Sequence, residues 1–152
     1  MLELVGEAFD TRHDPGQISV SEEERELLEK IHPDTLSELA NENGPIVWLL
    51  LVPTTAATMQ QFLARAITEK QLLFQTVPGA AYDAIYLCSA SVLPEFRKQG
   101  LAKKVAMNAI NNIRKAHNIA TLYYWPFTTE GRELAVSIAR DADLVLLEKK
   151  EL

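Results

Sequence analysis

Two uncharged, mainly apolar segments bounded by turn residues constrain the fold of this chain most strongly. The first covers residues 46–52 between Pro45 and Pro53, and the second covers residues 84–92 before Pro94. Uncharged runs of this length are typical of strands that are buried on both faces of a sheet. The sequence therefore predicts a sheet whose central strands are covered on each side.

Helical and strand patterns alternate around these two segments. Expected helices begin at Ser21, at Asp34 (ending near Asn43-Gly44), in the region 55–76, near residue 101 and at residue 133; further strands are expected over 120–125 and 144–147. Residues 1–20 fit either a short strand or a helical turn, with a loop at His13 to Gly16. This order predicts an α/β (α+β) fold, in which helices pack on a sheet and a helical insertion at about 55–76 separates the two buried strands.

The length and composition indicate one soluble domain over residues 1–152. Hydrophobic residues make up 47% of the chain and charged residues 24%, and the net charge is -6. An acidic surface argues against nucleic acid as the partner. The single Cys88 excludes an internal disulfide and suits a reducing compartment. No signal peptide is visible and no apolar run is long enough to span a membrane, so we expect a cytoplasmic protein.

Residues 97–102 form the candidate binding motif, because they follow the second buried strand and precede a helix. Gly100 permits a positive φ and a close approach of the backbone to a ligand. The first N–H groups of the following helix have no intrahelical partner and favour phosphate. Lysine near a helix start opposes the helix dipole, so Lys103 and Lys104 require some other interaction that offsets this cost, and a bound polyanion is one candidate. The sequence thus predicts an anion-binding turn.

The segment Val92 to Ala102 resembles the acetyl-CoA-binding motif of the GNAT-type N-acetyltransferases. That motif consists of Arg or Gln, two residues, Gly, one residue, and Gly or Ala; here Arg97, Gly100 and Ala102 match it. The resemblance covers residues 84–147 and implies a single GNAT-like domain with a mixed sheet and helices on both faces. The insertion at 55–76 is longer than the hairpin usual in the family.

The resemblance also implies acetyl-CoA as co-substrate and a set of cofactor-binding residues. Backbone groups of Ala90, Ser91 and Val92 would pair with the pantetheine arm. The pyrophosphate would be held by the amides of Lys98, Gln99, Gly100, Leu101, Ala102 and Lys103, and Arg97 belongs to the same cofactor-binding set.

The proton-transfer residues of the family are not at their usual positions. Tyr86 occupies the place of the carboxylate that many members carry on the motif strand, although the sequence favours the interpretation of Tyr86 as a packed strand aromatic. The tyrosine expected on the last helix is replaced by Ile138 or Ala139. We therefore take Tyr86 and Tyr124 as the catalytic candidates, acting beside proximity and desolvation.

The sequence is compatible with three functions. The first is an N-acyltransferase that acetylates an unidentified amine, and the second is a non-catalytic CoA-binding module. The third, an unrelated phosphate-binding domain, is disfavoured because neither Gly-Lys-Ser/Thr nor Gly-x-Gly-x-x-Gly is present. Cys88 and the scattered histidines show no metal-ligand spacing, so no metal is expected. The acidic start of the first helix favours a cationic acceptor, and the last strand offers an edge for a homodimer.

Overall fold

The computed structural model describes residues 21–97, 99–126 and 128–149. The expectations for residues 1–20 and for Lys98 lie outside this range. The elements are α2 (Glu22–Ile31), β1 (Leu36–Asn41), β2 (Gly44–Thr54), α3 (Ala56–Leu63), α4 (Glu69–Gln75), β3 (Ala84–Val92), η1 (Pro94–Phe96), α5 (Leu101–Arg114), β4 (Thr121–Tyr124), α6 (Thr129–Ala142) and β5 (Val145–Glu148).

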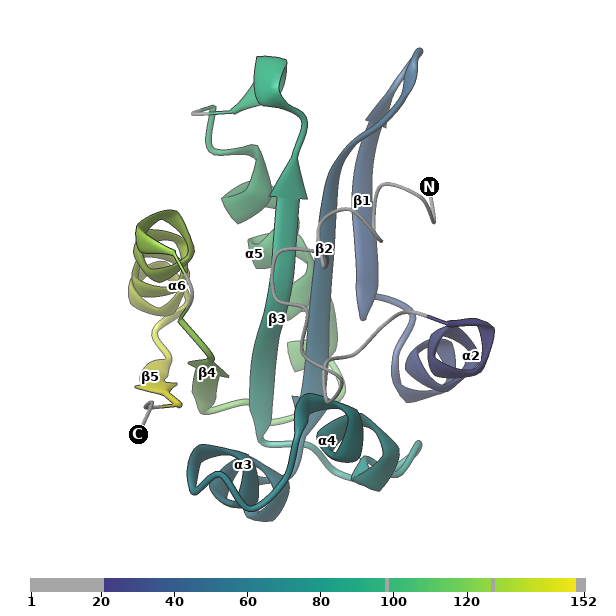
Figure 1. Ribbon diagram of the computed structural model, residues 1–152, viewed down its shortest axis with the longest axis vertical. Coiled ribbons are helices and arrows are strands. Elements are labelled where there is room, and N and C mark those ends of the chain that lie inside the picture. Colours follow the sequence, from purple (N-terminus) through teal and green to yellow (C-terminus); the bar gives the residue numbers. More distant parts are fainter. Residues whose placement is uncertain (1–20, 98, 127, 150–152) are drawn as a thin grey trace.

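The five strands form one mixed sheet in the order in which they occur in the chain (Figure 1). β1, β2 and β3 pair antiparallel, whereas β3, β4 and β5 pair parallel. The two strands expected from the uncharged segments are confirmed, and they are the neighbours β2 and β3. From Ile46 to Thr54 every residue of β2 is buried, as a strand covered on both faces requires.

Helices cover both faces of this sheet. α5 lies behind it in Figure 1 and packs against β1, β2, β3 and α6, while α3 and α4 lie in front of its lower end. α5 connects the parallel strands β3 and β4, and α6 connects β4 and β5. Crossovers of the same handedness place both helices on the same face of the sheet. The expected insertion is confirmed as α3 and α4, which begin at the N-caps Thr55 and Thr68.

The helix expected from Asp34 is wrong, because residues 36–41 form strand β1. They pair with β2 and turn through a hairpin whose Gly44 has a φ of 116°. Leu36 and Leu39 have a spacing that fits a helix face, but it also fits a strand with one side chain on each face of the sheet. Backbone pairing with the long β2 therefore decides between the two readings.

The last helix begins four residues earlier than expected. Thr128 accepts a hydrogen bond from the Gly131 amide at 2.9 Å, which makes it the N-cap of α6. The glycine at the third helical position concealed this start in the sequence, since glycine is a poor helix former.

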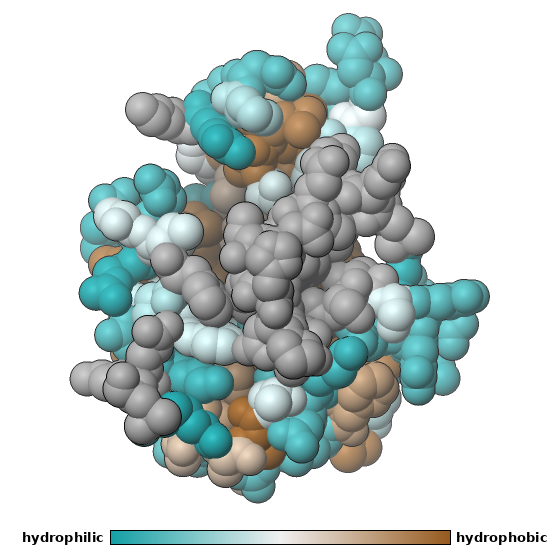
Figure 2. Space-filling model, viewed as in Figure 1, coloured by the Kyte–Doolittle hydropathy of each residue, from teal (hydrophilic) through white to brown (hydrophobic). Residues whose placement is uncertain are grey.

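Hydrophilic side chains cover most of the described surface in the view of Figure 2, and apolar side chains gather in separate patches at its upper and lower ends. In the described part of the chain, none of the helices combines the length and apolar character needed to cross a bilayer.

Candidate functional site

β3 and β4 separate halfway along β3, and this leaves a backbone edge without a neighbouring strand. β4 pairs with β3 only from Ala84 to Leu87, and it ends at Tyr124. β3 continues to Val92 beside β2, and the register of that pairing shifts between Leu50 and Leu51, which places a bulge at Cys88. Among the described residues, the other edge of residues 89–92 therefore faces no strand. Such an edge offers N–H and C=O groups to an extended ligand.

The N-terminus of α5 follows the free edge in the chain, after η1 and the turn at residues 97–100. Gly100, the N-cap, has a φ of 73° in the left-handed region that glycine permits, and no side chain among the described residues caps the helix. The first intrahelical bond runs from the Lys104 amide to the Gly100 carbonyl at 3.1 Å. The amides of Leu101, Ala102 and Lys103 precede that bond, so they have no acceptor within the helix. This geometry suits a phosphate group.

The basic side chains of the motif do not all point to this turn. The Nε of Arg97 donates to the Val92 carbonyl at 3.1 Å, so Arg97 lies across the end of the free edge. The Lys103 ammonium instead bonds to the carboxylate of Asp141 on α6, and this bond, followed by the one from Arg140, lowers the pKa of Asp141. Asp141 thus offsets the dipole penalty of a lysine at the helix start without a bound anion. Only the backbone of Lys103 remains for a ligand.

A buried polar cluster lies on the sheet where β3 and β4 separate. The hydroxyl of Tyr86 donates to the carboxylate of Glu69, and the thiol of Cys88 lies 3.7 Å from the same oxygen. Glu69 is 1% exposed, Tyr86 0% and Cys88 4%. Glu69 therefore places a carboxylate beside Tyr86, although the motif strand itself has none.

Nothing in the sequence marks Glu69 as a site residue. It is the first residue of α4, directly after the N-cap Thr68, where a glutamate normally faces solvent and favours the helix dipole. Its burial arises from the packing of the insertion on β3, a contact between segments distant in sequence.

Aromatic rings surround the Tyr86 end of this cluster. Phe62 of α3 lies edge-on to Tyr86 with 4.8 Å between ring centroids, and Tyr123 of β4 lies at 5.2 Å. The Tyr123 hydroxyl is hydrogen-bonded to Oγ1 of Thr54 at 2.7 Å, and burial raises the pKa of Tyr123 strongly. Tyr123 therefore stays protonated and acts as a fixed wall of the site.

The structure does not bring Tyr86 and Tyr124 together. Tyr86 is in register with Tyr123. Successive side chains of a strand point to opposite faces, so Tyr124 faces away from Tyr86. The Tyr124 hydroxyl donates to Oε2 of Glu148 at 2.9 Å. Burial, followed by this hydrogen bond and the charge of Glu148, raises the pKa of Tyr124 to about 12.

The Tyr124→Phe variant is expected to lose less stability than the unaltered protein as pH increases from 10 to 12. A phenol whose pKa rises from 10.0 to about 12 on folding stabilises the fold below pH 10, and this contribution is lost as pH increases toward 12. Near neutral pH, Tyr124→Phe should cost about 1 kcal/mol for the lost hydrogen bond. Urea midpoints of both proteins measured across the alkaline range test this; parallel curves would contradict it.

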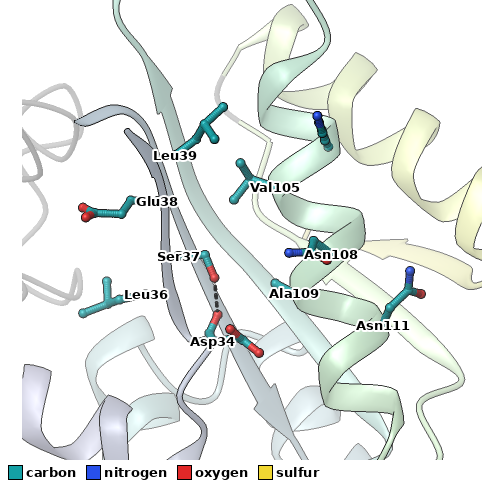
Figure 3. Close-up of a pocket in the computed structure, with 10 residues that line it drawn as sticks. Asp34, Leu36, Ser37, Glu38, Leu39, Val105, Asn108, Ala109 and Asn111 are labelled. Atoms are coloured by element: carbon teal, nitrogen blue, oxygen red, sulfur yellow. Dashed lines mark hydrogen bonds between the residues drawn. The ribbon is translucent and has the colours of Figure 1, made fainter. Parts of the chain in front are cut away.

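A hollow lies between β1 and α5, with a volume of about 500 Å³. In Figure 3, Leu39 of β1 faces Val105 of α5, and the Ser37 hydroxyl donates to the Asp34 carbonyl at 2.8 Å. The hollow lies on the α5 face of the sheet and contains neither Tyr86 nor Glu69. Its lining residues are Asp34, Leu36, Ser37, Glu38, Leu39, Lys104, Val105, Asn108, Ala109 and Asn111. They provide no nucleophile with an adjacent base.

The candidate site therefore consists of the free edge of β3, the N-terminus of α5 and the Glu69, Tyr86 and Cys88 cluster. Among the residues that the structure describes, no three His, Cys, Asp or Glu side chains are grouped in a way that could hold a metal ion. In comparisons with known proteins, no protein-family model, no curated protein and no solved structure matches the chain.

Proposed function

We propose that this chain is an acyl-CoA-dependent N-acyltransferase with a GNAT-like fold, which transfers acetyl from acetyl-CoA to an amine. One observation supports this above all: the free backbone edge of β3 is followed, after η1 and the turn at residues 97–100, by the N-terminus of α5, which no side chain of the described residues caps. A ligand that fits both must be extended, must have amide groups along its length and must end in a polyanion. Acetyl-CoA combines these features in its pantetheine arm and pyrophosphate.

In this proposal the cofactor lies along β3 from its C-terminal end toward its middle. The pyrophosphate binds the amides of Leu101, Ala102 and Lys103, with Gly100 giving the backbone its close approach. The pantetheine amides pair with Ala90, Ser91 and Val92 as an added strand. The thioester then reaches the bulge at Cys88, where β4 has ended.

The cluster at the bulge offers the two proton transfers that the reaction requires. The amine attacks the thioester carbonyl; a C–N bond forms and the C–S bond breaks. Glu69 first accepts a proton from the acceptor's ammonium, which frees the nitrogen lone pair for the attack, and the Tyr86 hydroxyl donates a proton to the leaving thiolate. The hydrogen bond between Tyr86 and Glu69 lets the proton on Glu69 return to Tyr86, and the second ammonium proton leaves to solvent.

A thermal-shift titration with acetyl-CoA is the first test. A ligand present at one hundred times its Kd stabilises the folded state by about 2.7 kcal/mol, so a clear increase in Tm is expected. Inorganic pyrophosphate should give a smaller shift, because it lacks the pantetheine arm. Free thiol should then appear when primary amines are added. If acetyl-CoA produces no shift, the proposal is wrong.

One observation favours a non-catalytic CoA-binding module as the second candidate. Tyr86 and Glu69 are 0% and 1% exposed, so an acceptor amine has little access to them in this conformation. This alternative predicts the same thermal shift with acetyl-CoA but no thiol release with any amine of a broad panel.

A further inference from the structure

The chain's own Lys149 holds its ammonium group against two aromatic rings near the candidate site. Its Nζ lies 4.1 Å from the centroid of Trp125 and 4.5 Å from that of Phe62. The two ring centroids are 6.4 Å apart and the ring planes are inclined by 75°, so the rings form a corner. Aromatic faces attract cations at these distances, especially when the cation is partly desolvated.

This cation site is next to the proposed reaction centre. Phe62, one of its walls, also packs edge-on against Tyr86, whose hydroxyl is bonded to Glu69. The distance between the centroids of Phe62 and Tyr86 is 4.8 Å. Phe62 therefore contacts both the cation site and the tyrosine of the proposed reaction centre.

The backbone of Lys149 is held in place independently of its side chain. Its amide donates to the Tyr124 carbonyl at 2.9 Å, which extends the pairing of β5 with β4 by one residue. The side chain is thus presented to the rings on a short, fixed tether. A group held in this way has a high effective concentration at its site, and it competes strongly with a free ligand of the same chemistry.

We propose that Phe62 and Trp125 form the acceptor subsite for a primary alkylammonium, and that Lys149 occupies it as an internal substitute for the acceptor. The acceptor is then an aliphatic amine on a flexible arm, such as a lysine side chain or a diamine. Its assignment as acceptor rests on the proposed acyltransferase function, whereas the cation site and its occupation by Lys149 do not. The net charge of -6 also favours a cationic ligand over an anionic one.

Binding of n-butylammonium, measured without acetyl-CoA, tests the site by tryptophan fluorescence. The chain has two tryptophans, and Trp48→Phe leaves Trp125 as the reporter. Trp48 suits this replacement, because its buried Nε1 has no hydrogen-bond partner among the described residues. In this background, Lys149→Met should bind n-butylammonium with a saturable change in emission, at least roughly tenfold more tightly than the parent. Adding Phe62→Leu should abolish the gain.

Two control variants separate this proposal from a purely structural role of Lys149. Lys149→Arg retains a cation over the rings and should stay closed to n-butylammonium, while Lys115→Met removes an exposed lysine elsewhere and should behave as the parent. Equal binding by the parent and by Lys149→Met, or no binding by either, would overturn the proposal. Because no acetyl-CoA is present, these results are independent of whether the chain transfers acetyl. If n-butylammonium binds but acetyl-CoA gives no thermal shift, the cation site is supported and the acyltransferase function is rejected.

Discussion

Glu69→Gln is expected to lower kcat/KM for acetyl transfer by roughly 10²–10⁴-fold, the usual range for loss of a positioned general base. Glutamine has nearly the same shape as glutamate, and its amide oxygen can still accept the hydrogen bond from Tyr86. Glutamine cannot accept a proton from the acceptor's ammonium. The effect should fall on kcat, and the thermal shift with acetyl-CoA should be unchanged, because Glu69 does not contact the free edge of β3 or the N-terminus of α5 in the proposed complex.

The matched control is Glu133→Gln, which removes an equal charge from the exposed surface of α6. Its turnover should equal that of the unaltered protein. The fold of Glu69→Gln can be checked by its urea midpoint, which is expected to stay close to that of the unaltered protein because glutamine keeps the shape of the side chain and the acceptor for Tyr86. Undiminished turnover in a folded Glu69→Gln variant would exclude Glu69 as the base and would leave proximity and desolvation to account for the rate.

Local chemistry explains the parts of the fold that the sequence predicts well. The segments 46–52 and 84–92 have no charges to place in water, so they become the two central strands. Gly100 adopts the left-handed conformation that few other residues tolerate, and it does so at the expected start of α5. Each of these features depends on neighbours within a few residues along the chain, which is why a single sequence reveals them.

Residues 36–41 and Glu69 were missed because their environments are made by distant segments. The strand β1 exists because β2 supplies a partner along its whole length. Glu69 is buried because α4 packs against β3, and a glutamate at the first helical position looks the same in sequence whether it faces solvent or the core. Sequence spacing also gave no reason to prefer Tyr123 over Tyr124 as the residue in register with Tyr86. That choice follows from the parallel pairing of β3 with β4.

The role of the basic residues in the motif also depends on a contact with a distant segment of the chain. Lys103 looked like part of a cationic cradle, but its ammonium is bonded to Asp141, which is 38 residues further along the chain. The proposed pyrophosphate site therefore depends on backbone amides and on the conformation of Gly100, with Arg97 beside it. A site of this kind is more sensitive to backbone changes than to the removal of one lysine.

Gly100→Val is accordingly expected to abolish the thermal shift with acetyl-CoA. Valine at a φ of 73° costs roughly 1–2 kcal/mol, and relief of that strain turns the first amides of α5 away from the ligand. Gly79→Val is the matched control, because Gly79 has a similar φ of 86° and, like Gly100, has open space where a Cβ would lie. Both variants should lose similar stability, measured by urea midpoint, but only Gly100→Val should lose the response to acetyl-CoA. Equal shifts in the two variants would mean that the turn before α5 does not hold the pyrophosphate. The β3 edge and the N-terminus of α5 would then no longer support acetyl-CoA as the ligand.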